Sequence, residues 1–174
     1  MTEIGAADVT LLVARIGLGA VFVAHGYNHI FGGGRIAGTG RWFDQLGMRP
    51  GIVHAWVASI TELVVGILLI LGIATPLACA GVVGTMVVAL VTNHARNGFF
   101  IFRPGEGYEY VMTLIVMGFG FSGTGAGRIS FDHQLGWWAP PGWIGLWICL
   151  LGGVGAVVLL ATSWRPQRSN AVVP

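Results

Sequence analysis

The sequence predicts an all-α integral membrane protein whose chain crosses the bilayer five times. Only 9% of its 174 residues are charged and 55% are hydrophobic, and the mean hydropathy is +0.77. A soluble domain of this size could not hide so much apolar surface, because folded proteins need a mostly polar skin. A net charge of +2 is also too small for electrostatic binding of nucleic acid. Composition therefore excludes a soluble enzyme, a nucleic-acid binder and a disordered segment.

Five stretches are apolar over roughly the 20 residues that a helix needs to cross a bilayer. They are residues 9–31, 52–74, 76–97, 108–123 and 143–164. The fourth stretch is short and rich in glycine toward its end. The fifth is about 31 Å long as a helix and has a tryptophan at each end, which suits the two membrane interfaces. Residues 1–10 contain no basic side chain, so the first stretch is expected to be a retained helix and not a cleaved signal peptide.

The connections and cysteines add two expectations. Trp42, Phe43 and Leu46 share one face within the glycine-rich segment 32–51, which predicts a short interfacial helix there. Cys79 and Cys149 lie far apart in apolar runs, and the sequence has no C-x-x-C pair. We therefore expect both cysteines to be small buried hydrophobic residues.

The arginines predict an orientation in the membrane. With five spans, one side of the bilayer receives Arg35, Arg41, Arg49, Arg96, Arg103, Arg165 and Arg168. The other side receives only Arg128, with Arg15 expected to snorkel out from inside the first helix. Under the positive-inside rule, the arginine-rich side is cytoplasmic. We thus expect a multi-pass protein of the cell inner membrane, with its N-terminus outside and its C-terminus in the cytoplasm.

Polar residues gather at one end of the predicted bundle. The first and third helices end there, and the second and fourth begin there. The residues concerned are His25, Asn28 and His29; His54 and Glu62; Asn93, His94, Arg96 and Asn97; and Glu106, Tyr108 and Glu109. Several pairs are four or eight apart and so share one helix face, which predicts a single polar cluster inside the bundle.

Glu62 carries the strongest functional signal. A carboxylate near the middle of the membrane costs several kcal/mol unless it is paired or protonated, so such groups normally face the bundle interior and serve function. The alternative is structural, with a protonated or histidine-paired Glu62 that locks helices together. Buried imidazole and carboxylate groups can relay protons, which suits a lipid quinone as ligand. Haem or a metal stays open, because histidine and glutamate also bind zinc, iron or copper, although no H-E-x-x-H pair occurs.

An ordered series of motifs resembles the DoxX family of small bacterial membrane proteins. The matches are Arg15-Ile16-Gly17-Leu18-Gly19 with Phe22, His25 and Gly26; Glu62 followed by residues 66–76; His94; and residues 98–100, 107–110 and 127–132. Together they cover about residues 9–133. The resemblance implies a four-helix transmembrane bundle over residues 1–133, with residues 134–174 adding an interfacial segment, a fifth transmembrane helix and a short tail.

The resemblance also implies redox work, because some relatives resemble the small subunit of thiosulfate:quinone oxidoreductase. Others are associated with a membrane complex that contains superoxide dismutase and a sulfurtransferase. The polar positions that carry over are His25, Glu62, His94 and Glu109, with Tyr108 adjacent. Family members often have lysine shortly after the first-helix glycine, where this chain has Asn28 and His29.

Three hypotheses follow. In the first, the protein is a membrane redox component, such as a subunit of a quinone-linked oxidoreductase, that binds a quinone or another small apolar ligand. Its site would contain Glu62 and His94 as proton-handling groups, His25 and Glu109 as their partners, and Tyr108, Asn28, His29, Asn93 and Arg96 as ligand-binding residues. In the second, it is a non-catalytic accessory subunit that meets a protein partner, or another copy of itself, through the fifth helix. In the third, it is a small-solute transporter.

Overall fold

The computed structural model describes residues 3–137 and 142–166, and this part of the chain is helical without a β-strand. Its helices are α1 (Ala6–Phe31), α2 (Arg35–Leu46), α3 (Gly51–Leu71), α4 (Thr75–Ala89), the π-helical turn η1 (Leu90–His94), α5 (Glu109–Thr124), α6 (Phe131–Leu135) and α7 (Gly142–Ser163). Arg168, used in the predicted orientation, lies outside the described residues.

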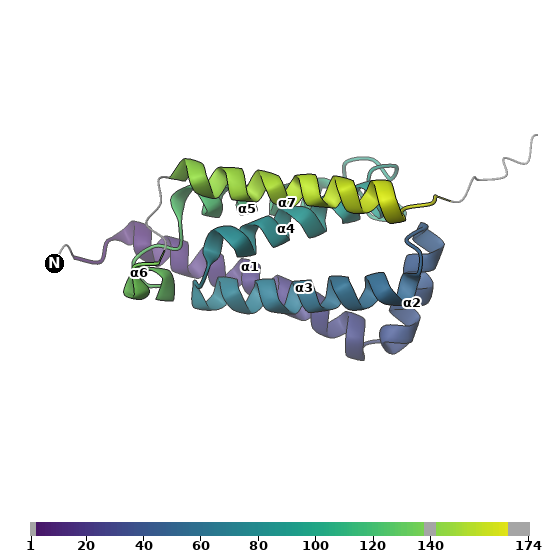
Figure 1. Ribbon diagram of the computed structural model, residues 1–174, viewed down its shortest axis with the longest axis horizontal. Coiled ribbons are helices and arrows are strands. Elements are labelled where there is room, and N and C mark those ends of the chain that lie inside the picture. Colours follow the sequence, from purple (N-terminus) through teal and green to yellow (C-terminus); the bar gives the residue numbers. More distant parts are fainter. Residues whose placement is uncertain (1–2, 138–141, 167–174) are drawn as a thin grey trace, which may run out of the picture.

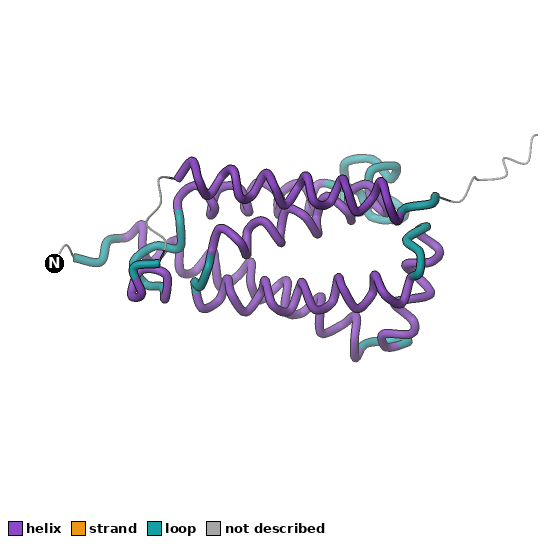
Figure 2. Tube along the Cα trace, viewed as in Figure 1, coloured by secondary structure: helices purple, strands orange, loops and turns teal. Residues whose placement is uncertain are grey.

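The long helices lie side by side along one axis (Figures 1 and 2). The start of α1 and the short helix α6 are at one end, which we call the α6 end. The helix α2 and the last turn of α7 are at the other, which we call the α2 end. The layout is therefore that of a bundle whose chain begins and ends at opposite ends.

Four of these helices are long and apolar enough to cross a membrane: Ala6–Phe31, Gly51–Leu71, Thr75–His94 and Gly142–Ser163. The chain is therefore a multi-pass membrane protein, and the predicted C-terminal span is among the four. A fifth span is not confirmed. At 16 residues, α5 is about 24 Å long, which is shorter than the hydrocarbon core of about 30 Å. It nevertheless packs along α4 and α7 inside the bundle.

Two glycines allow α1 and α3 to cross closely. A Cβ atom added to Gly19 would lie 2.6 Å from the Gly66 carbonyl oxygen, and one added to Gly66 would lie 2.6 Å from the Gly19 carbonyl oxygen. About two turns further along α1, a Cβ atom added to Gly26 would lie 2.8 Å from the Ser59 carbonyl oxygen. Small residues at such positions are how membrane helices bring their backbones into contact. This crossing fixes the relative rotation of the helices that carry the histidines and Glu62.

Arg15 closes the α6 end. Its side chain is fully buried, so the expectation that it snorkels to water is wrong. The guanidinium donates hydrogen bonds to the carbonyls of Leu69, of Ile70 at 2.8 Å and of Ile129 at 2.8 Å. The last carbonyls of a helix have no partner within it, and the guanidinium supplies one for the C-terminus of α3.

Asp132 serves the neighbouring helix at the same end. Its carboxylate accepts hydrogen bonds from the backbone N–H groups of Ala74 at 2.6 Å and Thr75 at 2.9 Å. These are unpaired donors at the N-terminus of α4, where a negative charge is also favourable. The polar residues of the α6 end are thus used to hold helix ends together.

At the α2 end, the predicted interfacial helix is present and extends over Arg35–Leu46. The segment after it is tied to the end of α7. The indole N–H of Trp164 donates to the Leu46 carbonyl at 2.9 Å, and the Arg165 N–H donates to the Gly47 carbonyl at 2.7 Å. Met48 and Trp164 also form an isolated β-bridge. These bonds join helices that lie on opposite sides of a large internal space.

Candidate functional site

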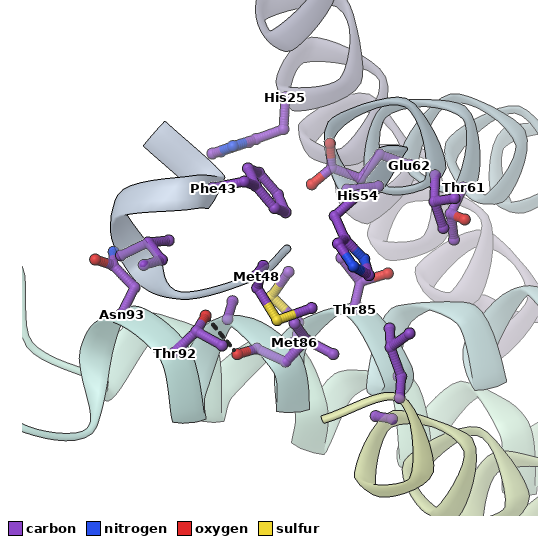
Figure 3. Close-up of a pocket in the computed structure, with 18 of the residues that line it drawn as sticks. His25, Phe43, Met48, His54, Thr61, Glu62, Thr85, Met86, Thr92 and Asn93 are labelled. Atoms are coloured by element: carbon purple, nitrogen blue, oxygen red, sulfur yellow. Dashed lines mark hydrogen bonds between the residues drawn. The ribbon is translucent and has the colours of Figure 1, made fainter. Parts of the chain in front are cut away.

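A cavity of about 480 Å³ lies in the α2 half of the bundle (Figure 3). Its walls come from α1, α2, α3, α4, η1 and α7, with Tyr110 of α5. The polar side chains on the wall are His25, His29, His54, Thr61, Glu62, Thr85, Thr92, Asn93, His94, Glu106 and Tyr110. Most of the remaining wall is apolar, and the volume falls within the range of about 300–1,000 Å³ that is usual for small-molecule pockets.

His29 and Glu62 meet at the cavity wall. The His29 Nδ1 atom lies 3.0 Å from the Glu62 Oε2 atom, and their side chains are only 16% and 5% exposed. The two atoms are close enough for an ion pair, but their directions do not fit a hydrogen bond, and neither atom has another partner among the described residues. Glu62 stands 11 residues along α3, about 16 Å from its start, and so near mid-membrane. A polar ligand atom or a proton between the two groups would satisfy both.

His25 lies one turn before His29 on α1 and extends the polar lining of the cavity beyond this pair. The ring centroids of the two histidines are 6.5 Å apart, and the His25 ring is stacked on Tyr110 at 6.5 Å. His25 is exposed although it lines the cavity. The series His25, His29 and Glu62 thus runs from an exposed position to a buried one.

His94 is held by both ring nitrogens. Its Nδ1 atom is 2.9 Å from the Glu106 carbonyl oxygen, and its Nε2 atom is 3.2 Å from the Asn93 amide nitrogen. A carbonyl oxygen only accepts, so Nδ1 carries the hydrogen and Nε2 accepts from the amide. The His94 ring therefore links η1 to the loop before α5.

Unlike His94, His54 is not held by hydrogen bonds to its ring within the described part of the chain. It lies in the first turn of α3, is 8% exposed and lines the cavity. Among the described residues, its ring nitrogens have no hydrogen-bond partner. Figure 3 shows its ring pointing into the same space as Glu62. The ring is thus free to bind a polar atom inside the cavity.

Four of the residues predicted for the site do not line the cavity, although they lie at the expected depth. Glu109 accepts a hydrogen bond from the Ile101 N–H at 3.1 Å, which stabilises the loop before α5. Tyr108 packs its ring against Phe99 at 5.5 Å. Asn28 and Arg96 are exposed and are absent from the cavity wall. Of the predicted residues, the cavity brings together Glu62, His94, His25, His29 and Asn93.

The cavity also contains polar residues that the sequence did not single out as site residues. Tyr110 stands between His25 and His94, whose ring centroid lies 5.9 Å from its own. Thr61 and Thr85 add hydroxyl groups to the wall. Tyr110 follows the predicted Tyr108 by two residues, and it lies in the first turn of α5, whereas Tyr108 precedes the helix.

Within residues 3–137 and 142–166, no group of three or more histidine, cysteine or acidic side chains is arranged to hold a metal ion. The described cysteines are both buried and unpaired, and each belongs to the apolar core.

Comparison with known proteins defines the class of the chain. The model of the DoxX family matches residues 10–95, which extend from α1 through η1 and include His25, Glu62 and His94. The protein is a DoxX family membrane protein, as the sequence motifs indicated. No characterised protein and no solved structure matches the chain significantly.

Proposed function

We propose that the protein binds a lipid quinone in the cavity and handles protons for it through Glu62 and His29. The single observation that carries the proposal is the buried His29–Glu62 pair, with a 3.0 Å contact, on the wall of a mainly apolar cavity of about 480 Å³. An apolar wall suits a quinone ring, and the few polar groups suit its carbonyl oxygens. The main support for this function is the geometry of the site, and membership of the DoxX family is secondary support.

Reduction of a quinone to a quinol takes two electrons and two protons. In this proposal the electrons come from the redox centre of a membrane-associated electron-transfer protein, and the chain's own residues supply the proton path. Glu62 and His29 exchange a proton with each other because their polar atoms are close and otherwise unpaired. The other histidines of the cavity wall, His25 and His54, replace that proton from the α2 end of the bundle.

His94 has a positioning role in this proposal. Both of its ring nitrogens are engaged, by Glu106 and by Asn93. It therefore fixes the wall opposite His25 and orients Tyr110, whose ring contacts both histidines. His54 is a further polar group on the wall that is free to meet a carbonyl oxygen of the ligand.

The test is the substitution Glu62→Gln, compared with Glu3→Gln, which makes the same chemical change at an exposed position at the α6 end. Binding of a soluble benzoquinone and quinone-linked proton uptake would be measured for the protein in lipid nanodiscs, with a chemical reductant as electron source. We expect the Glu62 variant to fold, to bind quinone within a few-fold of wild type, and to lose proton uptake. Unchanged proton uptake in the Glu62 variant would refute the proposal.

We also propose an interaction through α7. Trp143, Trp147 and Leu151 follow one another at intervals of four residues and are 73%, 65% and 65% exposed. Such a stripe contacts either lipid or another helix. Because the proposed function needs an electron-transfer protein, we propose that this protein, and not lipid, covers the stripe. A stoichiometric partner that is retained in mild detergent and lost on replacing Trp147 with Ala would support this; a monomer that retains its full activity would refute it.

For orientation we propose that the chain lies in the cell inner membrane with the α2 end toward the cytoplasm. This rests on Arg35, Arg41, Arg49, Arg96 and Arg103, all in α2 or in loops at that end. It requires that α5 and the segment after it complete a fifth crossing. The test places a cysteine at position 35 and treats cells with a membrane-impermeant thiol reagent. We expect the cysteine to be labelled only after the cells are opened.

A further inference from the structure

We propose that the ligand carries an apolar chain and that this chain leaves the cavity sideways, through a window between α3 and α7 that opens to the bilayer. The inference rests on the proposed function and deepens it, because it specifies a membrane-borne ligand with a tail. Three helices surround the apolar half of the cavity.

The helices α3 and α7 both line the cavity, but they are not neighbours in the packing. Among the described helices, α3 packs on α1, α2 and α4, and α7 packs on α4 and α5, whereas α3 and α7 scarcely touch. The helix α4 lies beneath both and forms the floor with Ala80, Gly81 and Gly84. The three helices therefore enclose a groove whose open side faces outward from the bundle.

Two residues mark the rim of this opening. Val57 of α3 and Gly155 of α7 each line the cavity and are exposed as well. Val57 is six residues from the start of α3, about 9 Å along the helix, and Gly155 is eight residues from the end of α7, about 12 Å. Both positions are inside the hydrocarbon layer, so the window meets lipid chains and not water.

The window is apolar, whereas the other exposed residues of the cavity wall carry polar atoms. His25, Trp42 and Glu106 also line the cavity and are exposed, and they lie on the far side, near α1 and the loop before α5. The end of the bundle between these openings is tied by the bonds of Trp164 and Arg165 to the α2–α3 segment. A ligand with a polar head and an apolar chain fits this division, with its head at His29 and Glu62 and its chain in the groove.

The volume of the cavity points the same way. About 480 Å³ is enough for a quinone ring and its substituents. A lipid quinone carries a chain of tens of carbon atoms, which this space cannot contain. The chain must extend out of the cavity, and the groove between α3 and α7 offers it an apolar route into the surrounding lipid.

The experiment narrows the window with Gly155→Leu. A Cβ atom added to Gly155 has no other atom within 4 Å, so the side chain can be accommodated without displacing the fold. The matched control is Gly120→Leu on α5, which is equally open and does not line the cavity. Val57→Trp narrows the same window from its other rim. Binding to the full chain in nanodiscs is followed by quenching of tryptophan fluorescence, with a chainless dimethoxy-methyl-benzoquinone and with the same ring carrying a decyl chain.

For Gly155→Leu and Val57→Trp, we expect the affinity for the decyl quinone to fall at least about tenfold, with the affinity for the chainless ring within about twofold of wild type. Gly120→Leu should change neither. Equal affinities for the decyl quinone in wild type and both window variants would overturn the window while leaving the proposed function intact. Loss of both ligands in the window variants would overturn it as well, because the rim would then belong to the head-group site. Failure of wild type to bind either quinone would refute the proposed function, and the window with it.

Discussion

Replacement of Arg15 by methionine should destabilise the protein strongly, although Arg15 lies far from the cavity. Arg15 is fully buried and donates to three carbonyls, those of Leu69, Ile70 and Ile129. Hydrogen bonds between membrane helices contribute about 0.6 kcal/mol each on average, which gives about 2 kcal/mol for three. The Leu69 bond is buried, and losing the partner of a buried carbonyl costs more, about 1–3 kcal/mol. We therefore expect the free energy of unfolding to fall by about 2–5 kcal/mol.

The assay is equilibrium unfolding in mixed micelles, in which increasing dodecyl sulfate unfolds the helices and circular dichroism reports the transition. Arg41→Met is the matched control, because it removes the same charge from an exposed position on α2. It should change the free energy of unfolding by no more than about 0.5 kcal/mol. A loss below about 1 kcal/mol for Arg15→Met would contradict the view that this guanidinium joins α1 to the C-terminal end of α3.

Two further predictions concern the frame around the site. Gly19→Leu should separate α1 from α3 and prevent stable folding, because a Cβ there meets the Gly66 carbonyl oxygen at 2.6 Å, whereas Gly17→Leu on the same helix has nothing within 4 Å and should be tolerated. Thermal unfolding in detergent compares the two, and equal melting temperatures would contradict the assigned crossing. His94→Ala should speed amide hydrogen exchange in the loop at residues 95–108, since it removes the bond to the Glu106 carbonyl. Exchange at the wild-type rate would show that the ring does not hold the loop.

The sequence predicted the bundle well because apolar length is a strong signal. The predicted segments 9–31, 52–74, 76–97 and 143–164 each overlap a helix long and apolar enough to span the membrane. The fourth predicted segment became α5, whose 16 residues fall short of that length. The helix α6 was not predicted, because five residues held by a serine cap leave little periodicity to detect.

The depth of the polar residues was predictable, but their direction was not. Glu62, His25 and His29 face the cavity, as their spacing on regular helices indicated. Glu109 and Tyr108 have the right depth but stand at the first turn of α5, where they serve the preceding loop. At the end of α4, the π-helical turn over Leu90–His94 changes the rotation per residue, and a regular helical projection cannot anticipate where Asn93 and His94 then point.

The contacts of Arg15 and Asp132 also could not be predicted from the sequence. Both residues were visible in the sequence, but each acts on backbone groups more than 50 residues away along the chain. Such bonds satisfy helix ends that only the assembled bundle brings together. Sequence spacing carries no information about them.

The central claim is that the cavity beside the His29–Glu62 pair binds a lipid quinone, and its most direct test is the quinone content of the purified protein. The full chain would be isolated in mild detergent, extracted with organic solvent, and its quinone determined from the absorbance change on reduction. We predict close to one quinone per chain for wild type, and a strongly reduced content for Gly155→Leu. Wild-type protein that contains no quinone, and takes up none when it is supplied in nanodiscs, would contradict the account.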